Sequence, residues 1–361
     1  MLPHFHALTI REVRRETADA VSLAFDVPPD LRDDYHFTQG QHLTLRTVIA
    51  GEEVRRTYSI CSSVDEYRLH GELRVAIKSM RGGTFSRFAI GHLHAGQALD
   101  VLTPDGHFHT VLDPAQRKHY VAFTAGSGIT PVMSLIKTTL VLEPHSCFTL
   151  IYGNRARDTI LFFEELQDIK NWYLPRFALH HVLSRAASDV PLASGRIDAD
   201  KCAVLLRLIP PATIDEAFVS GPSGLIDTVD LALRAAGVPQ QHIHIERFAP
   251  PGVAAPAAPP PTTLDDSEQV ALSVILDGKC HALQLPRSGA SVLEVALAAG
   301  LDLPYACKSG VCCTCRAKLL EGSVTMDKNY TLEAAEIAQG FILTCQSHPT
   351  SDKVAVSFDE R

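Results

Sequence analysis

One stretch near the C-terminus reads Tyr305-Ala306-Cys307-Lys308-Ser309-Gly310-Val311-Cys312-Cys313-Thr314-Cys315. Three of its cysteines are spaced C-x4-C-x2-C, and Cys345 follows after 29 intervening residues. This spacing is typical of a plant-type [2Fe–2S] cluster held by four thiolates. A loop of this length can wrap around one cluster because Gly310 is free to make a close turn. We therefore predict four ligands with backbone N–H groups facing their sulfurs: Cys307, Cys312, Cys315 and Cys345.

Zinc and disulfides are the alternatives for a four-cysteine set. Structural zinc sites favour two C-x2–4-C pairs of similar size, whereas here three cysteines stand together and the fourth is alone. Cys313 is predicted to be a non-ligand, with a shifted ligand frame as the open alternative. The remaining cysteines have no metal spacing and are predicted to be small buried hydrophobic residues: Cys61, Cys147, Cys202 and Cys280.

Composition limits the class of protein. A chain of 361 residues is expected to form two or three domains. The net charge of −8 argues against nucleic acid or an anionic membrane as partner. No apolar run reaches the length of a membrane span, and Met1–His6 lacks a signal-peptide pattern. Together with free thiols and an oxygen-sensitive cluster, this predicts a cytoplasmic protein. None of the 17 histidines has metal-ligand spacing, and none is assigned to a metal.

A proline- and alanine-rich stretch divides the chain at Ala249–Thr263, and we place a linker at residues 250–266. Repeated proline excludes a helix and favours an extended form of about 3.1 Å per residue, so 15 residues could reach roughly 45 Å. That length would let a domain move between two docking sites. A passive spacer explains the same composition.

The sequence therefore predicts a multidomain protein. Residues 1–113 contain short strands separated by turns, which favours an antiparallel β-barrel: 8–13, 20–27, 42–48, 69–78 and 98–102. Residues 114–249 alternate strands with helices, which predicts an α/β domain with a parallel sheet: strands 119–124, 147–152, 177–183, 217–220 and 242–248, helices 132–142, 159–170, 200–208 and 225–236. Residues 267–361 hold strands 270–276 and 281–285 and a helix at 292–299 before the cysteine loop, as an α+β ferredoxin domain of the β-grasp type would.

Three loops of the α/β segment indicate a nucleotide site. Thr124–Pro131 contains Gly-Ser-Gly, whose glycines would let the backbone approach a pyrophosphate, and Pro131 is predicted at the first helical position. The loop lacks the third glycine of the standard dinucleotide fingerprint, and alone it is weak. The runs 152–155 and 220–224 follow other strands. Ligands bind outside the carboxyl ends of such strands, so the three loops together predict a nicotinamide nucleotide site.

Two elements of the barrel segment point to a second phosphate-bearing ligand. Arg55–Ile60 combines cations, an aromatic ring and hydroxyls on one strand, with Arg56 and Tyr58 on the same face. Arg81–Ser86 is a turn into a helix that could bind a phosphate. An exposed strand and an N-cap serine are the alternative for either element alone.

These motifs, in this order, resemble the ferredoxin–NADP reductase superfamily. Arg56-x-Tyr58-Ser59 and Gly83-x-x-Ser86 are similar to its flavin signature, and G-S-G-I-T-P, Y-G-N-R and G-P to its pyridine-nucleotide signature. A C-terminal ferredoxin module is typical of one-chain oxygenase reductases. More narrowly, the runs 55–60, 244–248 and 329–333 resemble the reductase subunits of phenylacetyl-CoA oxygenase (epoxidase) complexes.

The resemblance implies the roles of individual residues. Arg56 would bind flavin phosphates, Tyr58 would contact the isoalloxazine and Ser59 would lie near its N5. Ser220 stands where the family commonly has cysteine, and the lost sulfur is expected to slow hydride transfer. The implied catalytic residues are Ser59, Ser220 and Glu246. The implied cofactor-binding residues are Arg56, Thr57, Tyr58, Ser59, Ala76, Ile77, Lys78, Gly83, Thr84, Phe85, Ser86, Gly126, Ser127, Gly128, Ile129, Thr130, Pro131, Asn154, Arg155, Ser184, Arg185, Ser220, Gly221, Pro222 and Phe248.

The predicted function is an NAD(P)H-dependent reductase that passes electrons through a flavin and a [2Fe–2S] cluster to a separate oxygenase. FAD is expected from the resemblance, with FMN as the alternative. NADPH is expected over NADH because the strand ends at Arg155 and Arg185 carry cations, although Asp158 lies close by. The alternatives are a reductase for a ring-hydroxylating dioxygenase or a steroid hydroxylase, and a non-catalytic electron carrier.

Overall fold

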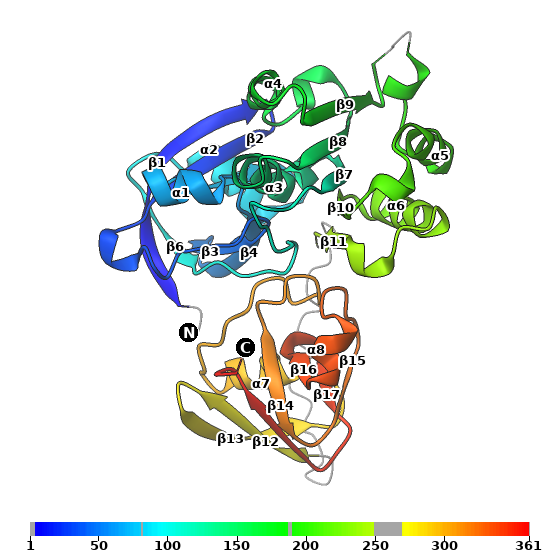
Figure 1. The fold of residues 1–361 in the computed structure, drawn as a ribbon. Coiled ribbons are helices and arrows are strands. Elements are labelled where there is room, and N and C mark those ends of the chain that lie inside the picture. The colour runs from blue at the N-terminus through cyan, green and yellow to red at the C-terminus, as the bar shows by residue number, and fades with distance from the viewer. Residues whose placement is uncertain (1–3, 81, 187–189, 249–268, 361) are drawn as a thin grey trace.

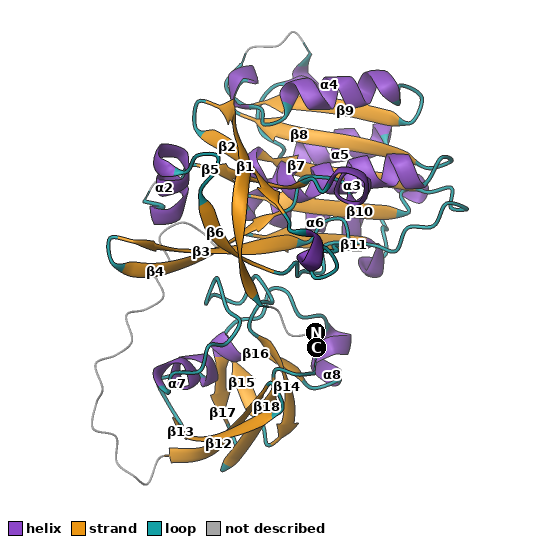
Figure 2. Cartoon of the chain, turned by 90° about the vertical axis from the view of Figure 1, so that its left-hand side faces the viewer, coloured by secondary structure: helices purple, strands orange, loops and turns teal. Residues whose placement is uncertain are grey.

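The structure is a computed structural model that describes residues 4–80, 82–186, 190–248 and 269–360 (Figure 1). The described strands form three large sheets that follow one another along the chain, and a two-stranded sheet near the C-terminus. The first two lie side by side, and the third lies at one end of this pair (Figures 1 and 2). The predicted linker at residues 250–266 is outside the described residues.

The first sheet is a six-stranded antiparallel barrel in the order β4-β3-β6-β1-β2-β5. A bridge between Ile60 and Val75 connects the two edge strands and closes the ring. Alternate side chains of every strand fill the interior, for example Leu23 and Leu45. The strands are β1 (Phe5–Thr17), β2 (Ala20–Asp26), β3 (His42–Ile49), β4 (Glu52–Ser59), β5 (Leu73–Lys78) and β6 (Ala98–Leu102).

Two helices accompany the barrel, α1 (Val64–His70) and α2 (Thr84–His92). The predicted strand at residues 69–78 is wrong in its first part, which belongs to α1. A capping box between Ser63 and Glu66 starts that helix, and Gly71 ends it with a φ of 66°. The strand β5 therefore begins only at Leu73.

The second sheet has five parallel strands in the order β11-β10-β7-β8-β9, which confirms the predicted α/β domain. Helices cover both of its faces. α3 and α4 pack on one apolar face and α5 and α6 on the other. The elements are β7 (His119–Ala125), α3 (Ile129–Leu142), β8 (Cys147–Asn154), α4 (Phe163–Trp172), β9 (Phe177–Leu183), α5 (Ala199–Leu208), β10 (Glu216–Gly221), α6 (Ser223–Ala235) and β11 (Ile243–Arg247).

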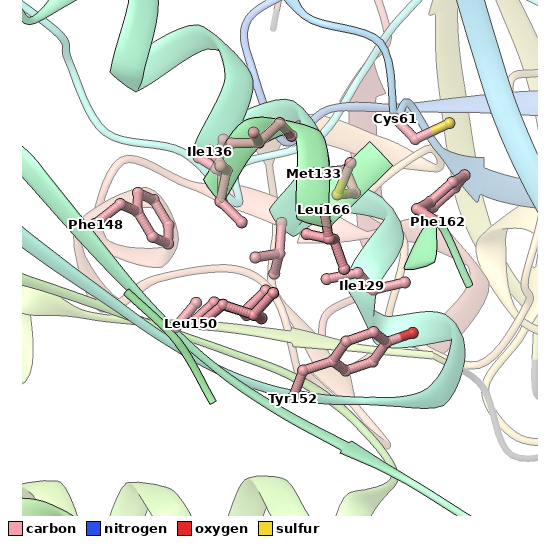
Figure 3. Packing of buried hydrophobic residues seen from close by; sticks show 14 of the residues in the cluster. Cys61, Ile129, Met133, Ile136, Phe148, Leu150, Tyr152, Phe162 and Leu166 are labelled. Carbon is pink, nitrogen blue, oxygen red and sulfur yellow. The ribbon is translucent and has the colours of Figure 1, made fainter. Parts of the chain in front are cut away.

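One cluster of buried hydrophobic residues contains side chains from both the barrel and the parallel-sheet domain, in addition to the cluster inside the barrel. Met133 of α3 and Leu150 of β8 belong to this cluster, and Cys61 joins it from the segment after β4 (Figure 3). Ala76 and Phe108 also belong to it. Because buried packing of this kind resists relative movement, the first two sheets form one rigid platform.

The third sheet is mixed, in the order β13-β12-β18-β14-β16, with β12 and β18 parallel, and it confirms the predicted β-grasp domain. Its core is separate from that of the platform and includes Leu293 and Ala296 of α7. The cysteine loop runs between α7 and β14. The elements are β12 (Gln269–Leu276), β13 (Lys279–Pro286), α7 (Val292–Ala298), β14 (Arg316–Glu321), β15 (Val324–Met326), α8 (Ala334–Ala338), β16 (Phe341–Leu343), β17 (Ser347–Pro349) and β18 (Lys353–Ser357).

The four cysteines predicted to be small buried residues differ in their exposure. Cys61 and Cys202 are buried, and Cys147 is partly buried. Cys280 is exposed, so the prediction is wrong there, because β13 is an edge strand of its sheet. Among the described residues, no helix has the length and apolar character needed to cross a membrane.

Candidate active site

A cavity of about 530 Å³ lies where the three sheets meet. It is lined by strands β4 and β5 of the barrel, the start of α2, the loop before α3, the end of β11 and the cysteine loop. Predicted residues that line it are Arg56, Thr57, Tyr58, Ser59, Ala76, Lys78, Gly83, Thr84, Phe85, Ser86, Ser127, Thr130, Glu246, Phe248, Cys307 and Cys312. The structure thus brings parts of all three predicted cofactor sites into one space.

Strand alternation decides which residues of β5 reach the cavity. Ala76 and Lys78 line it, while the side chain of Ile77 between them is fully buried in the barrel core. Only the backbone of Ile77 can therefore face a ligand. Lys78 is paired with Asp19 at 3.5 Å, so its ammonium group already has an anionic partner.

The turn into α2 has the shape of an anion-binding site. Gly83 is the N-cap residue, and a Cβ there would lie 2.6 Å from Ser86 Oγ, so only glycine fits without displacement. Ser86 Oγ accepts a hydrogen bond from the Met80 N–H at 3.2 Å and fixes the turn. The first N–H groups of a helix have no intrahelical partner and can bind a phosphate. Beside them, the Tyr58 ring packs against Phe85 with centroids 5.5 Å apart.

Glu246 is the most perturbed carboxyl group in the cavity. Burial raises its pKa to about 8, although Ser59 donates a hydrogen bond to Oε1 at 3.4 Å. Its Oε2 is buried and, within the described residues, has no hydrogen-bond partner. Buried polar atoms are normally paired, so these groups fit a cavity that receives a polar ligand such as a flavin.

His42 also lines the cavity and was missed by the sequence analysis. It stands opposite Ser59 in the β3–β4 ladder. Burial lowers the pKa of its imidazole, so the ring is neutral, and its Nε2 is buried without a partner among the described residues. Only the register of the hairpin, which the sequence does not show, places His42 beside the Ser59–Glu246 pair.

Because the pKa of Glu246 is raised in the folded protein, we expect the stability of the fold to depend on pH through this group. Below pH 4.5 the carboxyl is protonated in both the folded and the unfolded chain. As the pH rises toward 8, only the unfolded chain loses the proton, so this group makes the folded state progressively less stable. In flavin-free protein, Glu246→Gln should therefore gain several degrees in Tm relative to the native chain between pH 5 and 9.

Thermal unfolding followed by circular dichroism across this pH range measures the difference. Glu164→Gln, at an exposed position on α4, is the control and should follow the native curve. Parallel curves for Glu246→Gln and the native chain would show that Glu246 titrates normally.

The loops at the nucleotide end pack tightly against one another. A Cβ on Gly128 would lie 2.8 Å from Gly221 Cα, so these glycines allow contact between the two loops. The hydroxyl of Ser220, fully buried, donates to the Gly128 carbonyl at 2.7 Å. In this structure Ser220 thus holds the loop, whereas Gly126 has open space around it.

Pro131 is not at the first helical position, as predicted, but is the third residue of α3. A 3-10 turn at Gly126–Gly128 starts the helical path earlier. The proline is tolerated because the first four N–H groups of a helix need no intrahelical acceptor. Ile129 and Pro131 are both buried, so their side chains hold the helix in place rather than face the cavity.

The ends of β8 and β9 lie side by side outside the cavity. The Ser184 N–H donates to the Asn154 carbonyl at 2.9 Å, and the Arg185 N–H donates to the Arg155 carbonyl at 2.8 Å. Arg155 and Arg185 are both exposed. Asn154 Nδ2 is buried and unpartnered in the described residues. Two cations therefore stand at the edge where a nucleotide would extend.

The four predicted ligand cysteines approach one another as two pairs. A hydrogen bond from Cys312 is the largest cause that lowers the pKa of Cys307 to about 5, and Cys315 likewise lowers the pKa of Cys345. Among the described residues, no three His, Cys, Asp or Glu side chains are grouped as one metal ion would require. Two thiol pairs fit a dinuclear cluster, in which four cysteines are shared by two irons.

The backbone around these thiols also fits a cluster. The Ser309 N–H donates to Cys307 Sγ at 3.4 Å, and the N–H groups of Val311 and Gly310 lower the pKa values of Cys307 and Cys345. Gly310 has a φ of 78°, and a Cβ there would lie 2.9 Å from the Lys328 carbonyl oxygen. A tight turn that needs glycine therefore directs N–H groups at the sulfurs.

Cys313 is placed differently from its neighbours. Its Sγ lies 2.9 Å from Thr331 Oγ1, whereas the predicted ligands are paired with one another. Burial raises the pKa of its thiol to about 12. This placement supports its prediction as a non-ligand.

A cavity lined by the flavin-motif residues, the nucleotide loops and two pairs of facing cysteines together define a flavin and iron–sulfur oxidoreductase. Family models agree: residues 7–110 match an oxidoreductase FAD-binding domain, 123–230 an oxidoreductase NAD-binding domain, and 274–350 a 2Fe-2S iron-sulfur cluster binding domain. The chain belongs to the ferredoxin–NADP reductase family with a C-terminal [2Fe–2S] ferredoxin domain. It is an NAD(P)H-dependent oxidoreductase whose cofactors are FAD and a [2Fe–2S] cluster.

Similar proteins share this organisation. The chain is 44% identical over 358 residues to a subunit of the 1,2-phenylacetyl-CoA epoxidase of Escherichia coli (strain K12), covering 99% of this chain and 98% of the relative. It is 34% identical over 360 residues to the ferredoxin reductase component of 3-ketosteroid-9-alpha-monooxygenase of Rhodococcus rhodochrous, covering 97% and 96%.

Solved structures show the same fold. Phthalate dioxygenase reductase matches with a TM-score of 0.57 and 24% identity over 98% of both chains. An intact type IV self-sufficient cytochrome P450 monooxygenase matches with a TM-score of 0.69 and 21% identity, covering 98% of this chain and 41% of that longer chain.

Proposed function

We propose that this protein is the reductase subunit of a multicomponent oxygenase and that it takes electrons from NADPH. The main support for this proposal is that Ser59, Glu246 and the Cys307–Cys312 pair line the same cavity. One space that joins the nucleotide, flavin and cluster segments supports a continuous electron path. It argues against a carrier in which only the C-terminal domain works.

The chain's residues have distinct tasks in this proposal. When bound, the flavin accepts a hydride from the nicotinamide and the cluster accepts single electrons. The start of α2 and Arg56 bind phosphates, and Tyr58 supports the flavin ring. Ser59 and Glu246 place a hydroxyl and a protonated carboxyl in the reaction cavity, where they can hold a proton beside the flavin. Phe248, at the end of β11, covers the nicotinamide side.

We further propose phenylacetyl-CoA epoxidase as the oxygenase, in phenylacetate catabolism. Identity of 44% over nearly the full chain to a subunit of that enzyme supports it. A steroid monooxygenase is the second candidate, since a reductase component of such a system is 34% identical. The cytoplasm is the proposed location, because all nine cysteines, which lie within the described residues, are free thiols.

Reconstitution tests the partner. The purified protein, NADPH and the purified oxygenase subunits of a phenylacetyl-CoA epoxidase should together consume phenylacetyl-CoA. A 3-ketosteroid-9-alpha-monooxygenase oxygenase component with its steroid is the parallel arm. Turnover only with the steroid system would overturn the proposed partner while leaving the reductase chemistry intact.

The exposed Arg155 and Arg185 support NADPH as the donor, because guanidinium groups bind a 2′-phosphate with charge-assisted hydrogen bonds. Arg185→Ala should lower kcat/KM for NADPH by about 10- to 100-fold, the loss expected for a hydrogen bond to a charged group. Activity with NADH should change by less than about twofold, since NADH lacks that phosphate. Arg207→Ala, at an exposed position on α5, is the matched control.

Steady-state kinetics with both nucleotides measures the preference. An unchanged ratio in Arg185→Ala, or a native protein that prefers NADH, would contradict the assignment. Asp158 is also exposed at this edge and is the residue that would favour NADH.

A further inference from the structure

Arg55 connects the platform to the ferredoxin domain. Its Nη1 donates to the Leu303 carbonyl at 3.1 Å, and its Nη2 donates to Asp302 Oδ1 at 3.1 Å. Its guanidinium carbon lies 4.2 Å from the centre of the Tyr305 ring. One side chain of β4 thus makes two hydrogen bonds and a cation–π contact with a short segment of another domain.

The platform holds Arg55 firmly in this position. Its Nε donates to Glu53 Oε1 of the same strand at 2.8 Å, and with the ferredoxin domain in place only 5% of its side chain is exposed. The ring of Phe5 lies beneath it at 5.0 Å. Because a planar guanidinium held on both sides loses little further freedom when it binds, Arg55 is prepared for docking.

Two other contacts add to the same interface. Arg46 Nη1 lies 3.8 Å from Asp302 Oδ2, and His107 Nδ1 lies 3.6 Å from Glu336 Oε1. Arg46 is also bound to Asp100 of its own barrel at 3.0 Å. These contacts are longer than those of Arg55, so Arg55 makes the closest polar contact of the three.

The segment that Arg55 holds lies directly before the cysteine loop. Tyr305 is two residues from Cys307, and both line the cavity that Tyr58 and Ser59 also line. Arg56, the neighbour of Arg55, is exposed and belongs to the phosphate-binding side of the same cavity. The two adjacent arginines therefore contact different parts of the electron path.

We propose that Arg55 is a positioning residue that docks the ferredoxin domain on the flavin domain, and that the Asp302–Tyr305 segment is the matching guanidinium-binding surface. This inference rests on the proposed function. The step it serves moves one electron from the reduced flavin to the oxidised cluster, with no bond made or broken. Such a rate falls steeply with the distance between the two centres, so the docked geometry sets it.

The expected effect follows from the contacts. Removing hydrogen bonds from a charged group should weaken docking by about 10- to 100-fold. Arg55→Ala should then slow flavin-to-cluster electron transfer, whereas flavin reduction by NADPH should stay within about twofold of the native rate, since docking does not involve the nucleotide. Arg55→Lys keeps the charge but loses the planar fork, and it should give an intermediate rate.

Anaerobic stopped-flow mixing of the full-length holoprotein with NADPH resolves the two steps, because flavin and cluster absorb differently. Arg68→Ala is the matched control, since Arg68 is exposed on α1 of the same barrel and pairs with Asp65 of its own helix. Raising the salt concentration should slow cluster reduction in the native protein more than in Arg55→Ala.

A second variant, on the other side of the interface, distinguishes a loss of docking from a folding defect of Arg55→Ala. Asp302→Ala removes the partner from the other domain, where its side chain is 73% exposed, and it should also slow cluster reduction. The double variant should be slower than Arg55→Ala by less than the full effect of Asp302→Ala alone, because the Arg55–Asp302 contact is removed by either change while the Arg46–Asp302 contact is removed only by the second. Native rates of cluster reduction in both single variants would overturn the inference. A native protein whose cluster is never reduced by NADPH would instead overturn the proposed function.

Discussion

Replacing Cys345 by serine should destroy the [2Fe–2S] cluster and leave the flavin in place. A serine hydroxyl is a poor substitute for a thiolate, and Cys345 is paired with Cys315 in the structure. Cytochrome c reduction should fall by roughly 100-fold or more, since even residues outside the ligand set of a metal site contribute 10–100-fold. Electron flow from NADPH to ferricyanide should persist, because the flavin platform has its own core.

Cys313→Ser provides the matched control. Its thiol contacts Thr331 rather than the other cysteines, and a serine can keep that contact. The visible spectrum and the electron paramagnetic resonance signal of the cluster should remain, as should cytochrome c reduction. A normal cluster in Cys345→Ser, or its loss in Cys313→Ser, would show that the ligand set is wrong.

The second large effect is expected at Gly128. A methyl group there would lie 2.6 Å from Thr124 Oγ1 and 2.8 Å from the Gly221 backbone, and the latter cannot move without displacing the end of β10. Gly128→Ala should therefore destabilise the platform by about 1–3 kcal/mol, the usual cost of overpacking. Displacement of the loop should also lower kcat/KM for NADPH by at least about tenfold.

Gly224→Ala is the control for this change, because, outside its own helix backbone and chain neighbours, no atom lies within 4 Å of a Cβ at Gly224. Urea unfolding gives the stability of both variants, and steady-state kinetics gives their use of NADPH. Equal stability and activity of Gly128→Ala and Gly224→Ala would contradict the tight loop packing.

The sequence predicted the fold class and the order of the domains because each unit has a strong local pattern. Alternating strands, strand–helix repeats and the spacing of the cysteines can each be recognised within a short stretch of sequence. The error at residues 69–78 arose where a capping box and Gly71 outweighed an apolar run. The error at Cys280 arose because residue type alone does not show that a strand is at the edge of a sheet.

The site was predicted less completely than the fold. The flavin and cluster motifs contain most of the residues that line the cavity. His42 and Tyr305, which also line it, were not predicted as site residues. Each reaches the cavity only through tertiary contacts: His42 through the register of β3 with β4, and Tyr305 through docking of one domain on another. Ser220, implied as a catalytic residue, is found holding the Gly128 carbonyl, a contact between distant loops that no local pattern encodes.

Anaerobic addition of one equivalent of NADPH to the purified protein tests the central claim most directly. We expect flavin absorbance to fall first and the paramagnetic signal of the reduced cluster to appear afterwards, because segments of the nucleotide domain, the barrel and the cysteine loop line one cavity. A cluster that stays oxidised while the flavin is fully reduced, or one that is reduced in flavin-free protein, would contradict it.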